Sequence, residues 1–548
     1  MIGGPSVPKS TEDSGAASAR SASSAGTVGD SSFTSGRESV ARRRRIRSVR
    51  SEQRQRFVAL GVRLLHASLG ERLGRRAARF HPALDAQAGY RRFLARPDAR
   101  VPASIVSEDG PLVSILLPVF NAPLAALRAA LESVGRQTWS RFEVCAADAG
   151  PPDSPGSRGL REAAAADSRF RVIPLESNRG IGGNTGAALA SARGDFVLFL
   201  DQDDALAPDA LQQLLAALTR DPALDVIYSD KDNITPWGDR YEPYFKPDWS
   251  PELLLSTNYV AHATLVRREL LVAAGGIATD LDGAQDWDLF LRLAERTDRI
   301  AHVPRVLYHW RSVASSAASS LDATPYLARA WRETIWRALE RRALPGRVPA
   351  EGPLRILPAF EKPPRVSVVT GPEDLKDARG ELVLFQEPGF RPGSEDWIAA
   401  LTFWAQAPGM GAAGAVVHDR RGAIEHAGFA FAEGRTPPLF AGASARRWTP
   451  LGSPGFVRNV SALGPGAWMT RRSVLESVGP GASAADYSRR VRAASLRCVV
   501  VPQAVLVRTA GSLHLPEPIE DRDPYFSPSL DPTSPVPRPR EDAGVAST

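Results

Sequence analysis

The chain has 548 residues, enough for three or four domains of ~150 residues, and its hydrophobic fraction of 43% can fill sizeable cores. Two cysteines and the lack of any run of about 18 apolar residues exclude a disulfide framework and predict no membrane-spanning helix. The net charge of +7 is uneven: the first 100 residues have a balance of +12 and the other 448 carry −5. The basic excess belongs to the N-terminal segment, which argues against a nucleic-acid-binding protein. The two cysteines, both in apolar runs, predict a reducing, cytoplasmic compartment.

Residues 1–50 are rich in Ser, Gly and Arg, which predicts a disordered basic tail. Residues 51–108 form a helical basic segment, because apolar residues recur every three or four positions from Phe57 to Ala77 with arginines between them. Two interpretations stay open. The helix lies on the anionic inner face of the cytoplasmic membrane, or it docks on the next domain or another subunit. Three glycines in the pattern favour docking.

From residue 113 onward, short apolar runs alternate with helical patterns. The expected strands are 113–118, 142–147, 171–175 and 196–200, and the expected helices are 124–136, 159–167 and 185–193. This alternation predicts an α/β fold with a parallel sheet covered on both faces. Ligands of such sheets bind at the carboxyl ends of the strands.

An acidic cluster directly follows the fourth expected strand. Asp201, Asp203 and Asp204 stand within four residues, and such carboxylates repel one another unless a cation joins them. Mg²⁺ and Mn²⁺ prefer oxygen ligands and often share them with substrate phosphates. The alternative is a solvated turn, with Asp204 near the start of a helix at about Pro208.

Three further features are chemically suggestive. The glycine-rich loop 178–186 precedes an expected helix and would let the backbone approach a phosphate, and Arg179 either meets a base or phosphate or is a surface side chain. Asp286 either caps a helix or accepts a proton from an attacking hydroxyl. His309 either is structural or completes a metal or diphosphate site.

These pieces belong to a series of seven motifs: Pro118–Asn121, Asn178–Asn184, Leu200–Asp204, Ser229–Asp232, Phe245–Pro251, Gln285–Asp288 and Tyr308–Arg311. Together they resemble bacterial family 2 glycosyltransferases of the GT-A fold, especially enzymes that assemble O-antigen and related surface polysaccharides. The resemblance implies a nucleotide-diphospho-sugar transferase with a Rossmann-like sheet. It also implies a divalent metal, Mn²⁺ or Mg²⁺, bound by Asp201 and Asp203, a site to which we add His309.

The resemblance further implies that Asp286, in a Gln-Asp pair, is the catalytic base. A single base suffices for an inverting displacement, whereas a retaining hydrolase needs two carboxyl groups. We expect the nucleotide-sugar site to comprise Pro118, Asn121, Asp148, Asn178, Arg179, Gly180, Asn184, Asp201 and Asp203. We expect Asp204, Gln285, Trp287, Asp288 and Arg311 to support the site or to contact the acceptor.

One departure from the family concerns the nucleobase. The family usually has Asp-Asp-x-Ser after its second strand, and this sequence has Asp148-Ala-Gly-Pro. The second aspartate is missing, so the sequence does not distinguish UDP, dTDP or GDP as the donor nucleotide.

The region after about Pro364 is an internal repeat that has lost its acidic residues. Residues 379–385 repeat 193–199, and the alignment places Glu387 at Asp201, Gly389 at Asp203 and Val507 at His309. About 67 residues that build the nucleotide pocket are missing from this copy. We therefore expect a catalytic domain at 109–345, a degenerate GT-A-like domain at 346–514 and a disordered C-terminal tail at 515–548.

The function expected from these observations is hexosyl or deoxyhexosyl transfer from a nucleotide sugar to a saccharide or lipid-linked acceptor. The main alternative is a non-catalytic scaffold of a polysaccharide-synthesis complex at the membrane, which the intact acidic set disfavours. A nucleotidyltransferase would also use carboxylate-bound metal, but the motifs at 285–288 and 308–311 argue against it.

Overall fold

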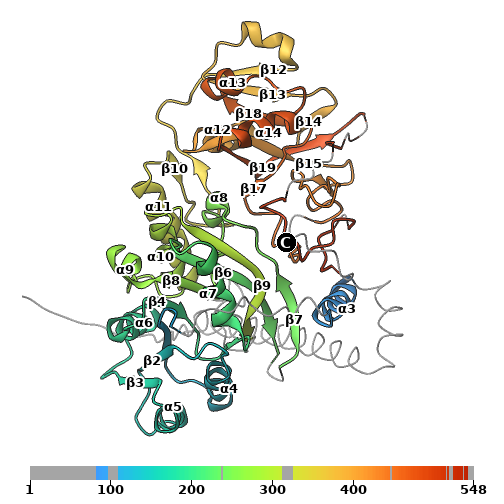
Figure 1. Ribbon diagram of the computed structural model, residues 1–548. Helices are drawn as coiled ribbons and strands as arrows, with labels where there is room; N and C mark the ends of the chain where they lie inside the picture. The colour runs from blue at the N-terminus through green and yellow to red at the C-terminus, as the bar shows by residue number, and fades with distance from the viewer. Residues whose placement is uncertain are drawn as a thin grey trace, which may run out of the picture. The chain divides into compact units, whose positions relative to one another are not determined.

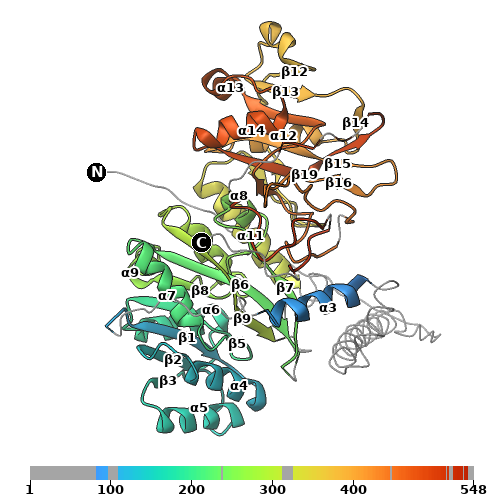
Figure 2. The ribbon, with the colours of Figure 1, turned by 45° about the vertical axis from the view of Figure 1, so that its right-hand side comes forward.

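The structure is a computed structural model that describes residues 82–96, 109–235, 238–311, 325–444, 447–511, 513, 515–517, 522–534 and 536–540 (Figures 1 and 2). Its two large sheets belong to one compact unit of the chain. The expected tail 1–50 and the amphipathic pattern at 57–77 lie outside the described residues. Within the segment 51–108, the structure describes α3 (Pro82–Leu94), whose buried Tyr90 donates a 2.6 Å hydrogen bond to Asp232 of the first sheet.

Nine strands form the first sheet: β1 (Val113–Val119), β2 (Phe142–Asp148), β3 (Phe170–Pro174), β4 (Phe196–Phe199), β5 (Ala205–Leu206), β6 (Val226–Ile234), β7 (Arg240–Tyr244), β8 (Thr264–Arg267) and β9 (Ile300–Arg311). Their order is β3-β2-β1-β4-β8-β6-β9-β5, with β7 beside β6. Strands β3, β2, β1 and β4 are parallel, as the sequence predicts, whereas β8 runs antiparallel to both β4 and β6. The sheet is therefore parallel in its first half and mixed in its second.

Helices cover both faces of this sheet. They are α4 (Leu124–Gly135), α5 (Pro155–Ala166), α6 (Gly180–Ser191), α7 (Ala210–Arg220), α8 (Pro251–Leu254), α9 (Arg268–Ala273), α10 (Gln285–Leu293) and α11 (Pro325–Arg341). Alternate residues of β1 enter two different cores. Ile115 and Leu117 pack in the core that includes α4 and α7, and Leu116 packs in the core that includes α6 and α10. This double burial explains why β1 is apolar along its length.

Helix α6 begins five residues earlier than the sequence pattern predicts, so most of the expected glycine-rich loop is the first part of a helix. The glycines are there for packing. A Cβ on Gly182 would clash with the carbonyl oxygen of Ala278, and a Cβ on Gly180 would clash with the carboxylate of Asp282. The Gly182 N–H donates a 3.0 Å hydrogen bond to Asp282, which satisfies an N-terminal amide of the helix.

The second sheet contains β12 (Val366–Val369), β13 (Leu382–Gln386), β14 (Phe390–Pro392), β15 (Met410–His418), β16 (Ile424–His426), β17 (Arg458–Val460), β18 (Ala467–Arg471) and β19 (Arg497–Arg508). Its helices are η4 (Pro372–Asp377), α12 (Trp397–Gln406), α13 (Arg472–Val478) and α14 (Ala484–Ala493), and a hairpin of β10 (Gly346–Arg347) and β11 (Leu357–Pro358) precedes it. The main order, β12-β13-β18-β15-β19-β14, reproduces β1-β4-β8-β6-β9-β5 of the first sheet, with each pair of neighbours in the same relative direction.

The repeat extends to local contacts. Gly194 and Gly380 each donate a backbone hydrogen bond to a serine hydroxyl on the first strand of their sheet, Ser114 at 2.8 Å and Ser367 at 2.7 Å. In the described segment 366–386, only η4 stands between the first two strands, and nothing corresponds to β2 and β3. The described part of the second domain thus lacks counterparts of β2 and β3, next to which the sequence predicts a nucleotide site.

The C-terminal segment differs from the disordered tail that its composition predicts. Asp523 accepts a 2.6 Å hydrogen bond from the backbone of Phe431, and Leu530 is buried. Polar and proline-rich residues fold here because the backbone of the second domain supplies their partners, a signal that composition does not carry. Residues 541–548 lie outside the described part.

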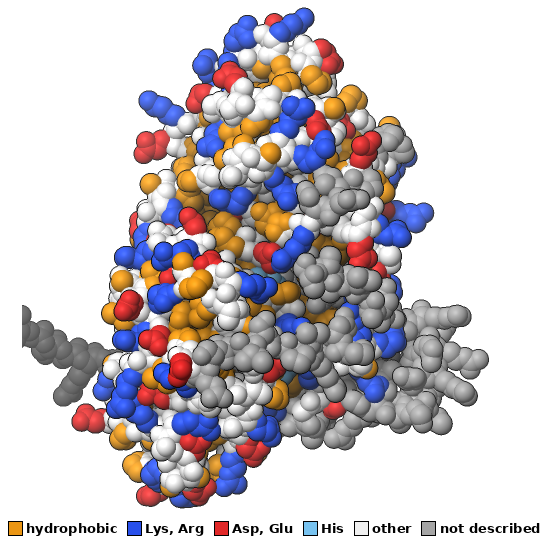
Figure 3. Space-filling model, in the orientation of Figure 1, with side chains coloured by type: hydrophobic (Ala, Val, Ile, Leu, Met, Phe, Trp, Pro, Cys, Tyr) orange, Lys and Arg blue, Asp and Glu red, His pale blue; other side chains and the backbone are white. Residues whose placement is uncertain are grey.

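Side chains of both charges are interspersed over the face seen in Figure 3, as expected for the nearly balanced composition that follows residue 100. In the part of the chain that the structure describes, no helix is both long and apolar enough to cross a lipid bilayer.

Candidate active site

The loop after β4 carries the acidic cluster, and Asp204 fixes its shape. The Asp204 carboxylate is fully buried, and it accepts a 2.6 Å hydrogen bond from Tyr308 Oη and a 2.7 Å hydrogen bond from the backbone N–H of Arg311. The Arg311 guanidinium donates a 2.7 Å hydrogen bond to the carbonyl of Asp203. Asp204 and Arg311 are therefore supporting residues that join the loop to the end of β9.

Asp201 and Asp203 present their carboxylates to the site. Neither accepts a hydrogen bond from the side chain of any described residue. Burial raises the pKa of Asp201 to about 7, and the nearby charges of Asp203 and Asp286 act in the same direction. Burial also raises the pKa of Asp203. Asp201 therefore interacts electrostatically with Asp203 of its own loop and with Asp286 from a distant part of the sequence, which favours either protonation or a bound cation.

Asp286 is in the first turn of α10, as the sequence suggests for a capping or catalytic carboxylate. Its Oδ1 accepts a 2.9 Å hydrogen bond from the backbone of Trp287, and its Oδ2 accepts a 2.9 Å hydrogen bond from Asn258 Nδ2. Burial raises the pKa of Asp286, and these hydrogen bonds oppose that shift. A raised pKa suits a carboxylate that takes up a proton near neutral pH.

The other residues of this motif hold α10 in place. Trp287 is buried and donates a 2.7 Å hydrogen bond to the carbonyl of Leu254. Asp288 pairs with Arg292 at 2.8 Å, and Gln285 accepts a 2.7 Å hydrogen bond from the backbone of Gly283. These contacts give all three a supporting role.

His309 lies at the end of β9 opposite Asp232 of β6. Its Nδ1 is 2.6 Å from Oδ1 of Asp232, and the other oxygen of that carboxylate accepts hydrogen bonds from Tyr90 and Arg240. The pair fixes the orientation of the imidazole and leaves Nε2 for another ligand.

The expected nucleotide side is formed by loops at the carboxyl ends of β1, β2 and β3. Phe120 stands between Pro118 and Asn121, and its backbone makes two hydrogen bonds with the Gln202 side-chain amide. The Phe120 N–H donates to Gln202 Oε1 at 2.8 Å, and Gln202 Nε2 donates to the Phe120 carbonyl at 3.2 Å. Asp148 is buried, and its Oδ1 accepts 3.0 Å hydrogen bonds from the Gly150 backbone and from Ser157. The two Gln202 hydrogen bonds therefore connect the end of β1 to the acidic loop.

The start of α6 is held by two asparagines. Asn178 Oδ1 accepts hydrogen bonds from the Gly180 backbone at 3.1 Å and from Asn184 Nδ2 at 2.9 Å. Asn184 Oδ1 accepts a 3.1 Å hydrogen bond from the backbone of Arg179, whose side chain is exposed. Asn178 and Asn184 thus shape the loop, and the Arg179 guanidinium extends into solvent.

Two residues of the site could not be singled out from the sequence. Lys231 is one of them: burial lowers the pKa of its ammonium group, and the charges of Asp204, Asp201 and Asp286 oppose that shift. Asn258, the partner of Asp286, is in an unremarkable polar loop. The acidic motif around Lys231 was a signal for the first residue, and the second had none.

A metal site complete in the protein alone is not present among the described residues, because no three His, Cys, Asp or Glu side chains are grouped closely enough. Asp201 and Asp203, whose carboxylates accept no side-chain hydrogen bond from the described residues, offer instead hard oxygen ligands at an incomplete site. Mg²⁺ and Mn²⁺ are commonly held by one or two carboxylates that share the ion with substrate phosphates. The residues therefore fit a divalent cation bound together with a diphosphate.

The fold and the carboxylates at its strand ends define a GT-A domain. Residues 114–273 match the sequence model described as glycosyl transferase family 2, so the chain contains a domain of that family.

The chain is also similar to several known proteins. The O-antigen biosynthesis protein RfbC of Myxococcus xanthus is 31% identical, over 79% of this chain and 40% of its own length. The uncharacterized protein y4gI of Sinorhizobium fredii is 29% identical, over 73% of this chain and 53% of its own length. Chondroitin synthase of Escherichia coli is 32% identical, over 36% of this chain and 29% of its own length. The chain thus spans about half or less of these relatives, and the match to RfbC is too long for the first domain alone.

Proposed function

We propose that the first domain transfers a hexosyl or deoxyhexosyl group from a nucleotide-diphosphate sugar to a saccharide or lipid-linked acceptor in cell-surface polysaccharide synthesis. The observation that carries the proposal is the electrostatic interaction of Asp201 with both Asp203 and Asp286, which links the acidic loop for a metal-bound donor to one carboxylate for a base. The names of RfbC and chondroitin synthase support a polysaccharide product.

Asp201, Asp203 and His309 would hold a divalent cation, Mn²⁺ or Mg²⁺. When bound, such an ion stabilises the negative charge that develops on a departing diphosphate. Asp232 supports this role for His309, since metal-binding histidines usually donate their other ring N–H to a carboxylate. Asp204, Tyr308 and Arg311 keep the loop in the shape that presents Asp201 and Asp203.

The reaction would be a single displacement. Asp286 takes the proton from the acceptor hydroxyl, whose oxygen forms a bond to the anomeric carbon of the donor. The bond between that carbon and the phosphate oxygen breaks on the opposite side, the nucleoside diphosphate leaves, and the anomeric configuration inverts. Asn258 keeps Asp286 oriented and favours its ionised form before the proton arrives.

The nucleotide is the least determined part of the donor. Asp148 uses Oδ1 for the protein, which leaves Oδ2 for a nucleobase, while the missing second aspartate removes a contact that the family resemblance implies. A panel of UDP-, dTDP- and GDP-sugars with Mn²⁺, scored by thermal shift and by release of the nucleoside diphosphate, would identify the donor. We expect one nucleotide class to stabilise the full-length protein and to be hydrolysed slowly without an acceptor.

Failure of every donor to bind or react would contradict the proposal and favour the scaffold alternative. We also propose that the protein acts in the cytoplasm, with contact to the inner membrane face through the basic segment 51–108. Liposome sedimentation with anionic vesicles at rising salt tests this contact, because an electrostatic attachment weakens as salt screens it.

A further inference from the structure

The second domain lacks an acidic site, yet it contacts the segment of the first domain that leads to the catalytic base. This segment, residues 245–259, connects β7 to β8 and contains α8. Its backbone has partners in the second domain and in the C-terminal segment: the Phe245 N–H donates a 2.8 Å hydrogen bond to the carbonyl of Pro450, and the Asp248 N–H donates a 2.7 Å hydrogen bond to the carbonyl of Pro524. The Phe245 side chain is fully buried in the second domain's core.

The strongest contact is a buried ion pair at Glu252 of α8. Its carboxylate is 4% exposed and accepts a 2.8 Å hydrogen bond from Arg497 of β19 and a 2.6 Å hydrogen bond from Asn459 of β17. Arg497 also donates through Nε, at 3.2 and 3.1 Å, so both carboxylate oxygens are engaged. A bidentate arginine–carboxylate pair fixes direction as well as distance.

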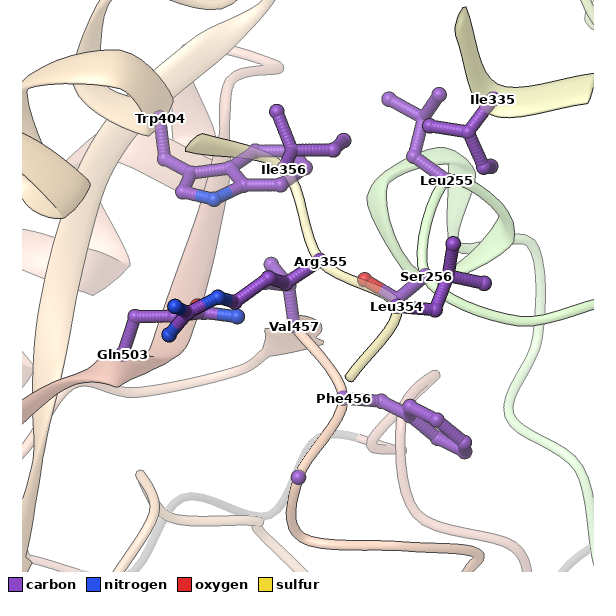
Figure 4. A pocket seen from close by; sticks show the side chains of 11 residues that line it. Leu255, Ser256, Ile335, Leu354, Arg355, Ile356, Trp404, Phe456, Val457 and Gln503 are labelled. Atoms are coloured by element: carbon purple, nitrogen blue, oxygen red, sulfur yellow. The ribbon is translucent and has the colours of Figure 1, made fainter. Parts of the chain in front are cut away.

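The surrounding interface is closely packed. The cavity shown in Figure 4 lies between Leu255 and Ser256 on one side and Trp404 and Val457 of the second domain on the other. Its volume is about 10 Å³, roughly the space for one water molecule. Residues of both domains thus line one small cavity next to α8.

On its other side, the same short segment contacts the base. The carbonyl of Leu254 accepts the 2.7 Å hydrogen bond from Trp287, the neighbour of Asp286. The carbonyl of Leu253 accepts backbone hydrogen bonds from Ser256 at 2.9 Å and Thr257 at 3.0 Å, which fix the turn that leads to Asn258. Asn258 then donates to Asp286 itself.

We propose that Glu252 and Arg497 are positioning residues, through which the second domain holds α8, Asn258 and Asp286 in the geometry for transfer. The degenerate copy then has a structural role, which is to keep Asp286 in position. This role rests on the proposed function for its effect on turnover, but the positional coupling itself does not. Misplacing a catalytic group by about 1 Å can cost on the order of a hundredfold in rate.

The test compares two arginines of β19 in the full-length protein. Arg497→Met breaks the pair with Glu252. Arg508→Met breaks a similar bidentate pair with Glu425, which lies within the second domain. We expect Arg497→Met to lower kcat at least about tenfold with the donor KM within about threefold, Arg508→Met to keep kcat within about twofold, and Arg497→Lys to restore part of the loss. Equal turnover of Arg497→Met and Arg508→Met would overturn the proposal.

Two further measurements separate positioning from misfolding and from the proposed function. The double variant Glu252→Gln/Arg497→Met leaves no charge buried without its partner. If the second domain positions the base, this variant should fold and keep the low kcat of Arg497→Met. A wild-type kcat in the double variant would overturn the proposal. Hydrogen exchange without substrates should rise in residues 250–259 and at the start of α10 for Arg497→Met, but not for Arg508→Met. Exchange confined to the second domain would overturn the inference, even if the wild-type protein transferred no sugar.

Discussion

His309 Nδ1 lies 2.6 Å from the Oδ1 atom of Asp232, whose other oxygen accepts hydrogen bonds from Tyr90 of α3 and Arg240 of β7. In the first sheet, Asp232 of β6 is opposite His309 of β9. At the equivalent positions of the second sheet, His418 of β15 is opposite Val507 of β19, so no carboxylate–imidazole pair forms there. This oriented imidazole therefore occurs at only one of the two equivalent places.

Replacing Asp232 with asparagine should weaken metal dependence. Without the carboxylate the imidazole loses its orienting acceptor, and we expect the Mn²⁺ concentration for half-maximal activity to rise about 10- to 100-fold. Tyr90→Phe is the control, because it removes one hydrogen bond from the same carboxylate and leaves the pair with His309 intact. Identical Mn²⁺ titrations for Asp232→Asn and the wild type would remove His309 from the metal site.

Replacing Asn258 with alanine should move the pH profile. Burial raises the pKa of Asp286, and the Asn258 amide opposes that shift by stabilising the carboxylate. Without the amide the pKa of Asp286 rises further, so the base is protonated up to a higher pH and the acid limb of kcat/KM moves upward. A limb that stays in place while kcat falls would show that Asn258 affects something other than the base.

Two glycines of α6 should respond oppositely to alanine. A Cβ on Gly182 clashes with the Ala278 carbonyl, whereas a Cβ on Gly186 meets no atom within 4 Å. Gly182→Ala should destabilise the protein by about 1–3 kcal/mol through overpacking, and Gly186→Ala should stabilise it by about 0.5–1 kcal/mol through helix propensity. Thermal unfolding measures both, and equal shifts would contradict the close packing at the start of α6.

The sequence was most informative where one local pattern decides the structure. The apolar strands before Asp148 and Asp201 predict the parallel sheet and place both residues at the carboxyl ends of strands. The repeated pattern at 193–199 and 379–385 predicts a second sheet, and the two sheets share their strand order. These features depend on neighbours within a few residues, which the sequence displays directly.

Features that depend on distant partners were not predicted. Gly180 and Gly182 look like part of a loop because Asp282 and Ala278, against which they pack, lie about a hundred residues away in the chain. The tail around Asp523 looks disordered because its partner is the Phe431 backbone. Lys231 and Asn258 interact with Asp286 only after folding brings β6 and the loop before β8 to α10.

Transfer by Asp203→Ala and Glu387→Ala, measured with the identified donor and Mn²⁺, tests most directly whether the first domain alone performs the chemistry. The strand registers place Gly389 at the position of Asp203, so the second domain offers no second carboxylate beside Glu387. We predict that Asp203→Ala folds normally and loses on the order of a hundredfold or more in turnover, while Glu387→Ala stays within about twofold of the wild type. Near-wild-type turnover of Asp203→Ala, or a large loss in a stably folded Glu387→Ala, would contradict a single working site.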